Sequence, residues 1–398
     1  MAINKIFIQP NDVLFFRDGR PFDAGGDFTA SLAFPPSPTT FYGAIRTLLL
    51  SRNETNFSNL INKSNWEAEL GNITDKNKSY EESFGSLTIN DFGIIRKLDG
   101  LLQRIYPVPS DILRIKDDED CVIVKPELSE DIVDKIHFNK AISDFILPPL
   151  EKNENNLESI DNYFLTEQGL SAYLLNLDIN LKPSNVQFIN RSEFYESEKR
   201  VGIRRDNKSL SSEEGFIYSL EFARLKNINN YLENIESGFY LELESELLNS
   251  IDNSISIKLG GENKSAYLRK LNKDIIKPPT PQIVNKQFKL ILLTPAIFDR
   301  GWIPDFIREN HEFEFDGIKI KLITALMGRY QGIGGWDLIR QTSKPLRRAV
   351  PPGSVFYFQI LSDSIDSDIL INKFQMKSIQ DQEYLAKQGL GLTIIGAW

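Results

Sequence analysis

The sequence predicts an antiparallel α+β protein made of two modules with few long helices. Short apolar runs of strand length recur along most of the 398 residues, whereas long segments with helical spacing are few. A cluster of three prolines, Pro278, Pro279 and Pro281, marks a boundary between two such regions. We therefore expect an N-terminal module over residues 1–285 and a C-terminal module over residues 286–398.

The N-terminal module is predicted to begin with a strand, a long loop and a helix. Residues 3–8 (INKIFI) have the composition of a strand, and a turn-rich stretch follows them. In PPSPTTFYGAIRTLLLSR (35–52), Pro38 and the two threonines after it are residue types that favour the start of a helix. Apolar residues recur at helical spacing from Phe41 onward. The Asn-, Lys-, Ser- and Glu-rich stretch at about 53–82 is predicted to be an exposed insertion.

The remainder of this module is predicted to be mainly strands and hairpins. Alternating short apolar runs occupy residues 85–124, and further strand-like stretches follow up to residue 271. A second insertion is expected at about 117–165, where an acidic turn and a polar loop interrupt the pattern. The segment TEQGLSAYLLN (166–176) predicts a short helix.

The C-terminal module is predicted to alternate strands with glycine-rich loops. QFKLILLTPAIFDRGWIP (287–304) indicates a strand that ends at a proline. Residues 318–361 are predicted to form a strand, a glycine-rich loop, a basic segment and a second strand. The closing segment GLGLTIIGAW (389–398) predicts a final strand opened by two glycines.

Composition limits the classes of function. The 46 Lys+Arg against 55 Asp+Glu give a net charge of −9, which ordinarily argues against a nucleic-acid partner. The single cysteine, Cys121, excludes an intramolecular disulfide and a Cys-rich zinc site. The first residues lack the pattern of a signal peptide, and no apolar run approaches the ~20 residues of a membrane span. We expect a cytoplasmic protein with no membrane partner.

Enzyme signatures are missing from the sequence. The only histidines, His137 and His311, lie far apart and away from the glycine loops, so acid–base catalysis by histidine has no candidate. The glycine runs do not match a phosphate-binding loop. The tetrapeptide at 25–28 (GGDF) is similar to the GGDD turn of nucleotide cyclases, but Phe28 replaces the second acid that a metal pair needs. We expect no catalytic residues, no metal site and no cofactor.

One basic segment stands out in this net-acidic chain. Residues 321–348 hold six basic residues and one acid, Asp337, together with four glycines, Tyr330 and Trp336. Glycines let the backbone approach a phosphate, arginines make bidentate phosphate contacts, and aromatic rings offer faces on which bases stack. The segment therefore favours nucleic-acid binding, and the alternative is a flexible loop whose charges are merely solvated.

Two smaller basic clusters have equally good structural explanations. The first is KRVGIRR (199–205), which continues to Lys208, and the nearby acids Glu196, Glu198 and Asp206 allow a salt-bridge network instead. The second, RDGRP (17–21), precedes the predicted helix start and is in principle an anion site. A turn with an Arg–Asp pair is the alternative there.

Long collinear motifs resemble a known family. They are PNDVLFFRDGRPF (10–22), FPPSPTTFYGAIRT (34–47), RVGIRRD with EEGFIYSLEFAR (200–224), LGGENKSAYL (259–268), LLTPAIFDRGWIP (292–304), PLRRAVPPGSVFYF (345–358) and GLGLTIIGAW (389–398). Together they span essentially the whole chain. The sequence resembles the third subunit of the Cmr complex, the type III-B CRISPR RNA-guided effector, which belongs to the RAMP superfamily.

The resemblance implies a fold and a function. It implies two ferredoxin-like (RRM-like) modules with insertions and glycine-rich loops, and a non-catalytic subunit that holds the 5′ repeat-derived handle of the CRISPR RNA. The partners implied are the CRISPR RNA, a Cas10-type large subunit and the adjacent RAMP backbone subunit. The residues carried over as RNA-binding are Arg17, Arg20, Arg46, Arg204, Arg205, Lys264, Arg329, Gly332, Gly334, Gly335, Trp336, Arg340, Arg347 and Arg348.

Two other functions stay open at this point. The first is a RAMP endoribonuclease that processes CRISPR RNA, for which the usual histidine-based arrangement is missing. The second is a protein–protein adaptor of a related type III complex that makes no contact with RNA, with the basic segment facing an acidic partner.

Overall fold

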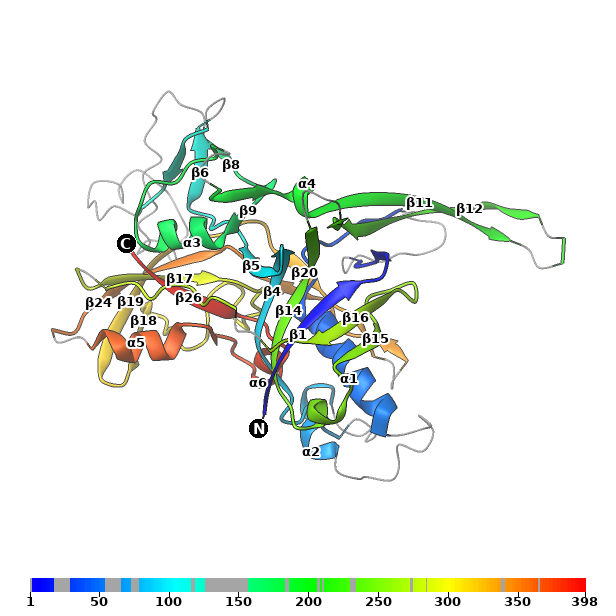
Figure 1. Ribbon diagram of the computed structural model, residues 1–398. Helices are drawn as coiled ribbons and strands as arrows, with labels where there is room; N and C mark the ends of the chain where they lie inside the picture. Colours follow the sequence, from blue (N-terminus) through cyan, green and yellow to red (C-terminus); the bar gives the residue numbers. More distant parts are fainter. Residues whose placement is uncertain are drawn as a thin grey trace.

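Strands dominate the computed structural model of the protein, and helices are few, which confirms the predicted α+β class (Figure 1). The described residues are 2–17, 29–53, 66–72, 79–115, 119–125, 157–182, 186–205, 208–209, 211–229, 234–272, 275–283, 285–337, 341–363 and 366–398. Within these ranges, no helix has both the length and the apolar character needed to cross a membrane.

The N-terminal sheet is built around its first strand, β1 (Ile3–Pro10). This strand lies antiparallel between β14 (Asn234–Glu244) and β16 (Ser265–Lys270), and β4 (Thr88–Leu98) pairs with the far side of β14. Consecutive residues of β1 are buried because both faces of the sheet are covered. The nine-stranded sheet also contains β5 (Leu101–Tyr106), β9 (Tyr163–Thr166), β10 (Phe188–Asn190), β13 (Ile228–Asn229) and β15 (Ser254–Lys258).

The predicted N-terminal helix is present as α1 (Pro38–Asn53). Proline suits the first helical position because its missing N–H has no helical partner there in any case. Phe41, Ile45 and Leu49, spaced four residues apart, are fully buried. The Phe41 ring lies 4.8 Å from that of Phe239 in β14, so the apolar face of α1 packs on the sheet.

The C-terminal sheet repeats this strand arrangement. Its first strand, β17 (Gln287–Leu292), lies antiparallel between β24 (Val355–Ile360) and β26 (Leu392–Ala397), and β19 (Ile318–Leu326) pairs with the far side of β24. The helix α5 (Ser367–Phe374) connects β24 to β26 and packs on this sheet through Phe374. The remaining elements here are β18 (Glu312–Phe315), β25 (Lys377–Ser378) and α6 (Glu383–Lys387).

A buried ionic network joins the two halves of the chain. Lys289 of β17 and Asp111 are both fully buried, with the Lys289 Nζ 3.2 Å from an Asp111 carboxylate oxygen. The same carboxylate accepts hydrogen bonds from the hydroxyls of Tyr173 in α3 (Glu167–Leu174) and Tyr357 in β24. The helix α3 confirms the prediction of a helix over 166–176.

Two long strands form an arm that extends away from the body of the molecule (Figure 1). The arm is the antiparallel pair β11 (Tyr195–Arg205) and β12 (Ser212–Leu225). Its base packs on β2 (Val13–Leu14) and β3 (Thr29–Ala30) through a small apolar cluster that contains Phe222. Further short elements are α2 (Glu67–Leu70), η2 (Glu81–Ser83), β6 (Ile112–Ile115), β7 (Cys121–Ile123), β8 (Leu157–Ser159), α4 (Arg191–Phe194) and η5 (Leu247–Ser250).

The predicted insertions lie partly outside the described residues. Most of 53–82 and residues 126–156 of the second insertion fall there. The described parts of the first insertion contain α2 and the start of η2, and the second insertion contributes β7 and β8, which pair with the two edges of β6. The boundary near residue 285 falls between β16 and β17, which belong to different sheets.

Candidate nucleic-acid interface

The glycine-rich loop and the basic segment fold against each other as a ribbon. Here "ribbon" means residues 328–337 and 341–349, which contain β20 (Gln331–Ile333), β21 (Trp336–Asp337), β22 (Thr342–Ser343) and β23 (Arg347–Ala349). In the β20–β23 pair, Gly332 lies opposite Arg348 and Ile333 opposite Arg347. One motif glycine, Gly332, and one motif arginine, Arg348, are therefore cross-strand neighbours, although they are distant in sequence.

The glycines of the ribbon leave room for one apolar side chain. A Cβ on Gly332 would lie 3.2 Å from Leu346 Cδ1, and one on Gly334 would lie 3.6 Å from the same atom. Leu346 thus covers the glycine strand, and its own side chain stays largely exposed. A side chain at Gly332 would press on Leu346 and change the shape of the surface.

Exposed aromatic rings accompany the exposed cations of the ribbon. Tyr330 and Trp336 are 63% and 58% exposed, which is unusual for such large rings in the absence of a partner. The Arg348 guanidinium lies 4.8 Å from the centre of the Tyr330 ring, and the neighbouring Arg329 is exposed. Bases stack on such rings, and guanidinium groups contact phosphates.

Arg347 and Lys344 lie on the side of the ribbon that meets the N-terminal half. Arg347 donates a 3.1 Å hydrogen bond to the Glu81 carboxylate of η2. Lys344 donates a 2.7 Å hydrogen bond to the Tyr80 hydroxyl and lies 4.5 Å from the centre of that ring. Burial lowers the pKa of Lys344 to about 8, with Asp337 opposing the shift. The Lys344 charge is therefore held in a site that partly excludes water.

A second group of predicted residues lies at the base of the arm. Lys264 and Arg200 lie 4.9 and 5.1 Å from the centre of the Phe222 ring. The glycine loop before Lys264 is tied to the N-terminal loop, because the Gly261 amide donates to the Phe15 carbonyl. Arg17, two residues further on, is exposed.

The cluster 199–205 divides between the base and the outer part of the arm. Arg200 pairs with Glu198 at 2.7 Å, as the salt-bridge alternative predicted, and also with Asp12 at 3.6 Å, which it did not include. Arg204 and Arg205 are exposed in the outer part of β11. Val201, Ile203 and Ile217 beside them are also exposed. The outer arm therefore presents an apolar surface flanked by positive charge.

Three predicted residues stand apart from these groups. The Arg46 guanidinium of α1 donates to the Leu70 carbonyl at 2.6 Å and to the Ser83 carbonyl, and it lies over the Phe84 ring. These contacts connect α1 to the segments around it and hold the half-buried Arg46 side chain against backbone carbonyls. Arg20 and Arg340 lie outside the described residues.

The sequence interpretation did not include Tyr80 and Tyr384, whose rings lie beside Lys344 and Arg347 of the ribbon, among the candidate site residues. It counted Lys344 in the basic segment but did not name it as an RNA-binding residue. Tyr80 belongs to a stretch predicted to be an insertion, and Tyr384 lies in α6, so no local pattern connects them to the ribbon. In the sequence, Lys344 is one of several basic residues of the segment, and nothing local distinguishes it from the others. The contact between Lys344 and Tyr80 bridges 264 positions, which a single sequence does not reveal.

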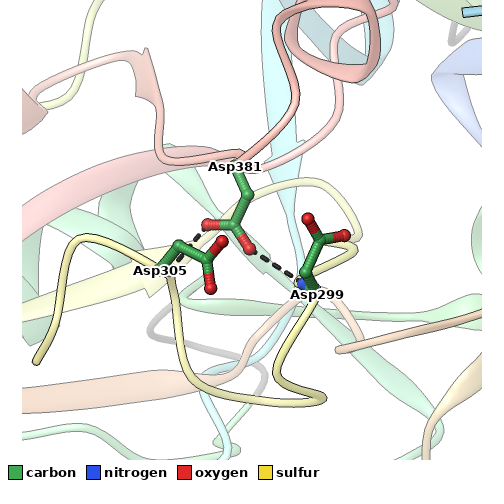
Figure 2. Close-up of side chains that lie close together, drawn as sticks. All are labelled: Asp299, Asp305 and Asp381. Atoms are coloured by element: carbon green, nitrogen blue, oxygen red, sulfur yellow. Dashed lines mark hydrogen bonds between the residues drawn. The ribbon is translucent and has the colours of Figure 1, made fainter. Parts of the chain in front are cut away.

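Three carboxylates also lie close together, outside the predicted site. Figure 2 shows Asp299, Asp305 and Asp381, whose oxygens lie within 4.8 Å of one another. Asp381 accepts hydrogen bonds from the backbone amides of Asp299 and Asp305, at 2.9 and 2.7 Å. Burial raises the pKa of Asp381. Arg300 pairs with Asp305, and the Gln382 amide donates to Asp299. The cluster therefore connects the loop at 299–305 with the segment just before α6.

A known protein family matches nearly the whole chain. The family model described as "CRISPR-associated protein (Cas_Cmr3)" matches residues 6–398. A comparison with curated proteins found no significant match.

Similar solved structures include "Cryo-EM structure of the Type III-B Cmr-beta bound to cognate target RNA and AMPPnP, state 1", at 16% identity, covering 89% of this chain and 86% of that chain with a TM-score of 0.47. "Cryo-EM structure of the Type III-B Cmr-beta bound to cognate target RNA" has the same identity and coverage and a TM-score of 0.48. The apo-state structure covers 69% of this chain and 98% of that chain, at 16% identity and a TM-score of 0.28.

These identities and TM-scores are too low to carry an inference about fold or function, so the assignment depends on the family model. That model covers nearly the whole chain, as the collinear motifs do. The chain belongs to the family of CRISPR-associated proteins described as Cas_Cmr3, as its sequence motifs predicted.

Proposed function

We propose that this chain is a non-catalytic RNA-binding scaffold subunit of a type III-B CRISPR effector complex in the cytoplasm. It holds the 5′ repeat-derived handle of the CRISPR RNA and docks on a Cas10-type large subunit and on the adjacent RAMP backbone subunit. The observation that carries the proposal is the ribbon, where the exposed Arg348 lies against the exposed Tyr330 ring and opposite Gly332, and where Trp336 is exposed as well. Family membership supplies the biological context.

Strand order supports the finer description of the fold, two ferredoxin-like modules. Each module has four core strands, and its first strand pairs with the third on one side and with the fourth on the other. The second strand pairs with the outer side of the third. The orders are β4-β14-β1-β16 and β19-β24-β17-β26. The helix α1 connects the first two strands of one module, and α5 connects the last two of the other.

The mechanism follows from the chemistry of the ribbon. Arg329 and Arg348 neutralise phosphates, while Tyr330 and Trp336 offer faces for unstacked bases. The net charge of −9 opposes long-range attraction of RNA, so we expect weak and salt-sensitive binding by the isolated chain. Neighbouring subunits then share the same RNA strand.

The double variant Arg329→Ala/Arg348→Ala tests the proposal. Affinity for a single-stranded RNA that carries the handle should fall, and the slope of log affinity against log salt should decrease by roughly 0.7 for each phosphate that is no longer neutralised. The matched control is Arg52→Ala/Arg114→Ala, which removes two partly exposed, ion-paired arginines away from the ribbon. An unchanged affinity and slope in the ribbon variant would favour the adaptor function.

The non-catalytic assignment has its own test. The purified full-length chain is incubated with repeat-containing RNA, with and without Mg²⁺, and the products are separated on a denaturing gel. We expect intact RNA in both conditions. Cleavage that follows the full-length protein through purification would support the endoribonuclease function instead.

A further inference from the structure

Two consecutive arginines of the ribbon have different surroundings. Arg347 and Arg348 both belong to β23, and consecutive side chains of a strand point to opposite faces. Arg348 is exposed and lies 4.8 Å from the centre of the Tyr330 ring. Arg347 instead donates a 3.1 Å hydrogen bond to the Glu81 carboxylate of η2 and is half-buried. The alternation of the strand therefore leaves Arg348 exposed and brings Arg347 into contact with the N-terminal half of the chain.

Lys344 makes a second contact with the same end of η2. Its Nζ donates to the Tyr80 hydroxyl at 2.7 Å and lies 4.5 Å from the centre of that ring. Tyr80 is the N-cap of η2, and Glu81 is the first residue of this short helix. Two cations of the ribbon, three positions apart, thus contact two consecutive residues of η2. These contacts join segments that are more than 260 positions apart.

The position of η2 is itself fixed by contacts that do not involve the ribbon. The Arg46 guanidinium of α1 donates to the carbonyl of Ser83, the last residue of η2, and to that of Leu70, the last residue of α2. A guanidinium suits this place, because the last carbonyls of a helix have no helical partner and carry partial negative charge. Phe84, directly after η2, also packs on α1, with its ring centre 5.6 Å from that of Tyr42.

We propose that Tyr80 and Glu81 are positioning residues, which hold the ribbon in the orientation that leaves Arg348 and Tyr330 exposed. Arg347 then anchors the ribbon and does not contact the RNA. The inference rests on the proposed function, because the surface held in this way is the one to which RNA binding is assigned. It also gives a function to η2, which begins within a stretch that the sequence predicts to be an insertion.

Exchanging the charges of the Arg347–Glu81 pair tests the proposal. The variants are Glu81→Arg, Arg347→Glu and the double variant, all in the full-length chain without RNA. Hydrogen exchange of ribbon and arm peptides is followed by mass spectrometry. Each single substitution replaces an attraction with a repulsion, so ribbon amides should exchange about two- to fivefold faster, the range for one exposed ion pair. The double variant restores the attraction, and its ribbon exchange should return to that of the unaltered chain.

Two controls distinguish a local effect from general destabilisation. Amides of the arm should exchange equally in all variants. Glu383→Arg makes the same change of charge in α6, where Glu383 pairs with Lys387, and ribbon exchange should stay unaltered. The proposal is overturned if the single variants leave ribbon exchange unchanged, if the double variant does not reverse the effect, or if Glu383→Arg has an equal effect.

RNA binding then tests the role of Arg347. Affinity for a fluorescent, mixed-sequence single-stranded RNA of about 12 nucleotides is measured by anisotropy at low salt. The double variant has the same net charge as the unaltered chain, so we expect the two affinities to agree within about twofold, whereas Arg347→Glu should bind more weakly. A double variant that recovers ribbon protection but not affinity would show that Arg347 contacts the RNA, against the proposal. A chain that binds no RNA even with its partner subunits would refute the proposed function, and the exchange measurement, which contains no RNA, would still decide whether η2 holds the ribbon.

Discussion

The substitution Asp111→Ala is expected to destabilise the chain strongly. Asp111 is the shared acceptor of Lys289 and of two tyrosine hydroxyls, all in the core between the two sheets. Without the carboxylate, the fully buried Lys289 ammonium loses this counter-charge and keeps the rings of Tyr173 and Tyr357, whose centres lie 3.7 and 5.9 Å from its Nζ. Tyr357 keeps an alternative acceptor, the Val124 carbonyl at 3.1 Å.

The magnitude follows from these interactions. Removing one partner of a buried ion pair costs about 3–5 kcal/mol, because the remaining charge is uncompensated. The Tyr173 hydroxyl loses its acceptor as well, at about 1–3 kcal/mol, although water that enters the new cavity reduces this cost. We therefore expect the free energy of unfolding to fall by about 4 kcal/mol. Lys289→Met should cost less, because Asp111 keeps both tyrosine donors.

The double variant Asp111→Ala/Lys289→Met isolates the charge effect. Its chain contains no buried unpaired ammonium at this position, so it should be more stable than Asp111→Ala alone, with a coupling energy of about 2–3 kcal/mol. Burial lowers the pKa of Lys289 in the folded chain. The unfolded chain therefore binds more protons between that lowered pKa and about 10.4, and stability rises with pH in this window. The deficit of Asp111→Ala should shrink as the pH approaches 10.

Guanidinium titration followed by tryptophan fluorescence measures these differences. Trp398 contacts Tyr357 edge to face, with ring centres 5.0 Å apart, so one fluorophore lies beside the network. Calorimetry at a fixed scan rate provides a second measurement. The reasoning fails if Asp111→Ala unfolds within about 1 kcal/mol of the unaltered chain, or if the double variant is less stable than Asp111→Ala.

Three further expectations concern the interface, the arm and the core. RNA affinity should fall as the pH rises through about 8, because Lys344, one of the positive charges of the ribbon, loses its proton there. Anisotropy between pH 7 and 9 should find a smaller fall for Lys344→Arg, whose charge does not titrate. A Cβ on Gly202 would overlap the Tyr218 ring, so Gly202→Ala should lower the hydrogen-exchange protection of amides in the arm and leave the two large sheets protected. An equal loss of protection across the whole chain would contradict this. Arg104→Met should cost about 3–5 kcal/mol in denaturant unfolding, because Asp91 then loses its buried partner, and a cost below about 1 kcal/mol would count against the pair.

Much of the architecture was predictable because it depends on local pattern. Alternating or continuous apolar runs mark β1, β17 and β26, and Pro38 with regularly spaced apolar residues marks α1. These signals are local because the side-chain period of a strand or helix is set by backbone geometry. The candidate RNA surface was predictable in the same way, since its glycines, arginines and aromatic residues lie within one short segment, 328–349.

The remaining features depend on pairings between distant segments. No local pattern connects Tyr80 with Lys344, or Asp111 with Lys289, which lie 264 and 178 positions apart. The family resemblance likewise carried Arg46 over as an RNA-binding residue, and only the structure shows that its guanidinium donates to the carbonyls of Leu70 and Ser83.

The sequence by itself determined the α+β class, the family and the composition of the ribbon. Only the tertiary structure decided that Arg348 is exposed to solvent, that Arg347 pairs with Glu81 and that the half-buried Arg46 is bound by backbone carbonyls. The physical reason is that an arginine has the same local signature in all three settings. Its surroundings depend on how the two sheets pack, and that packing is the sum of many small, long-range contacts.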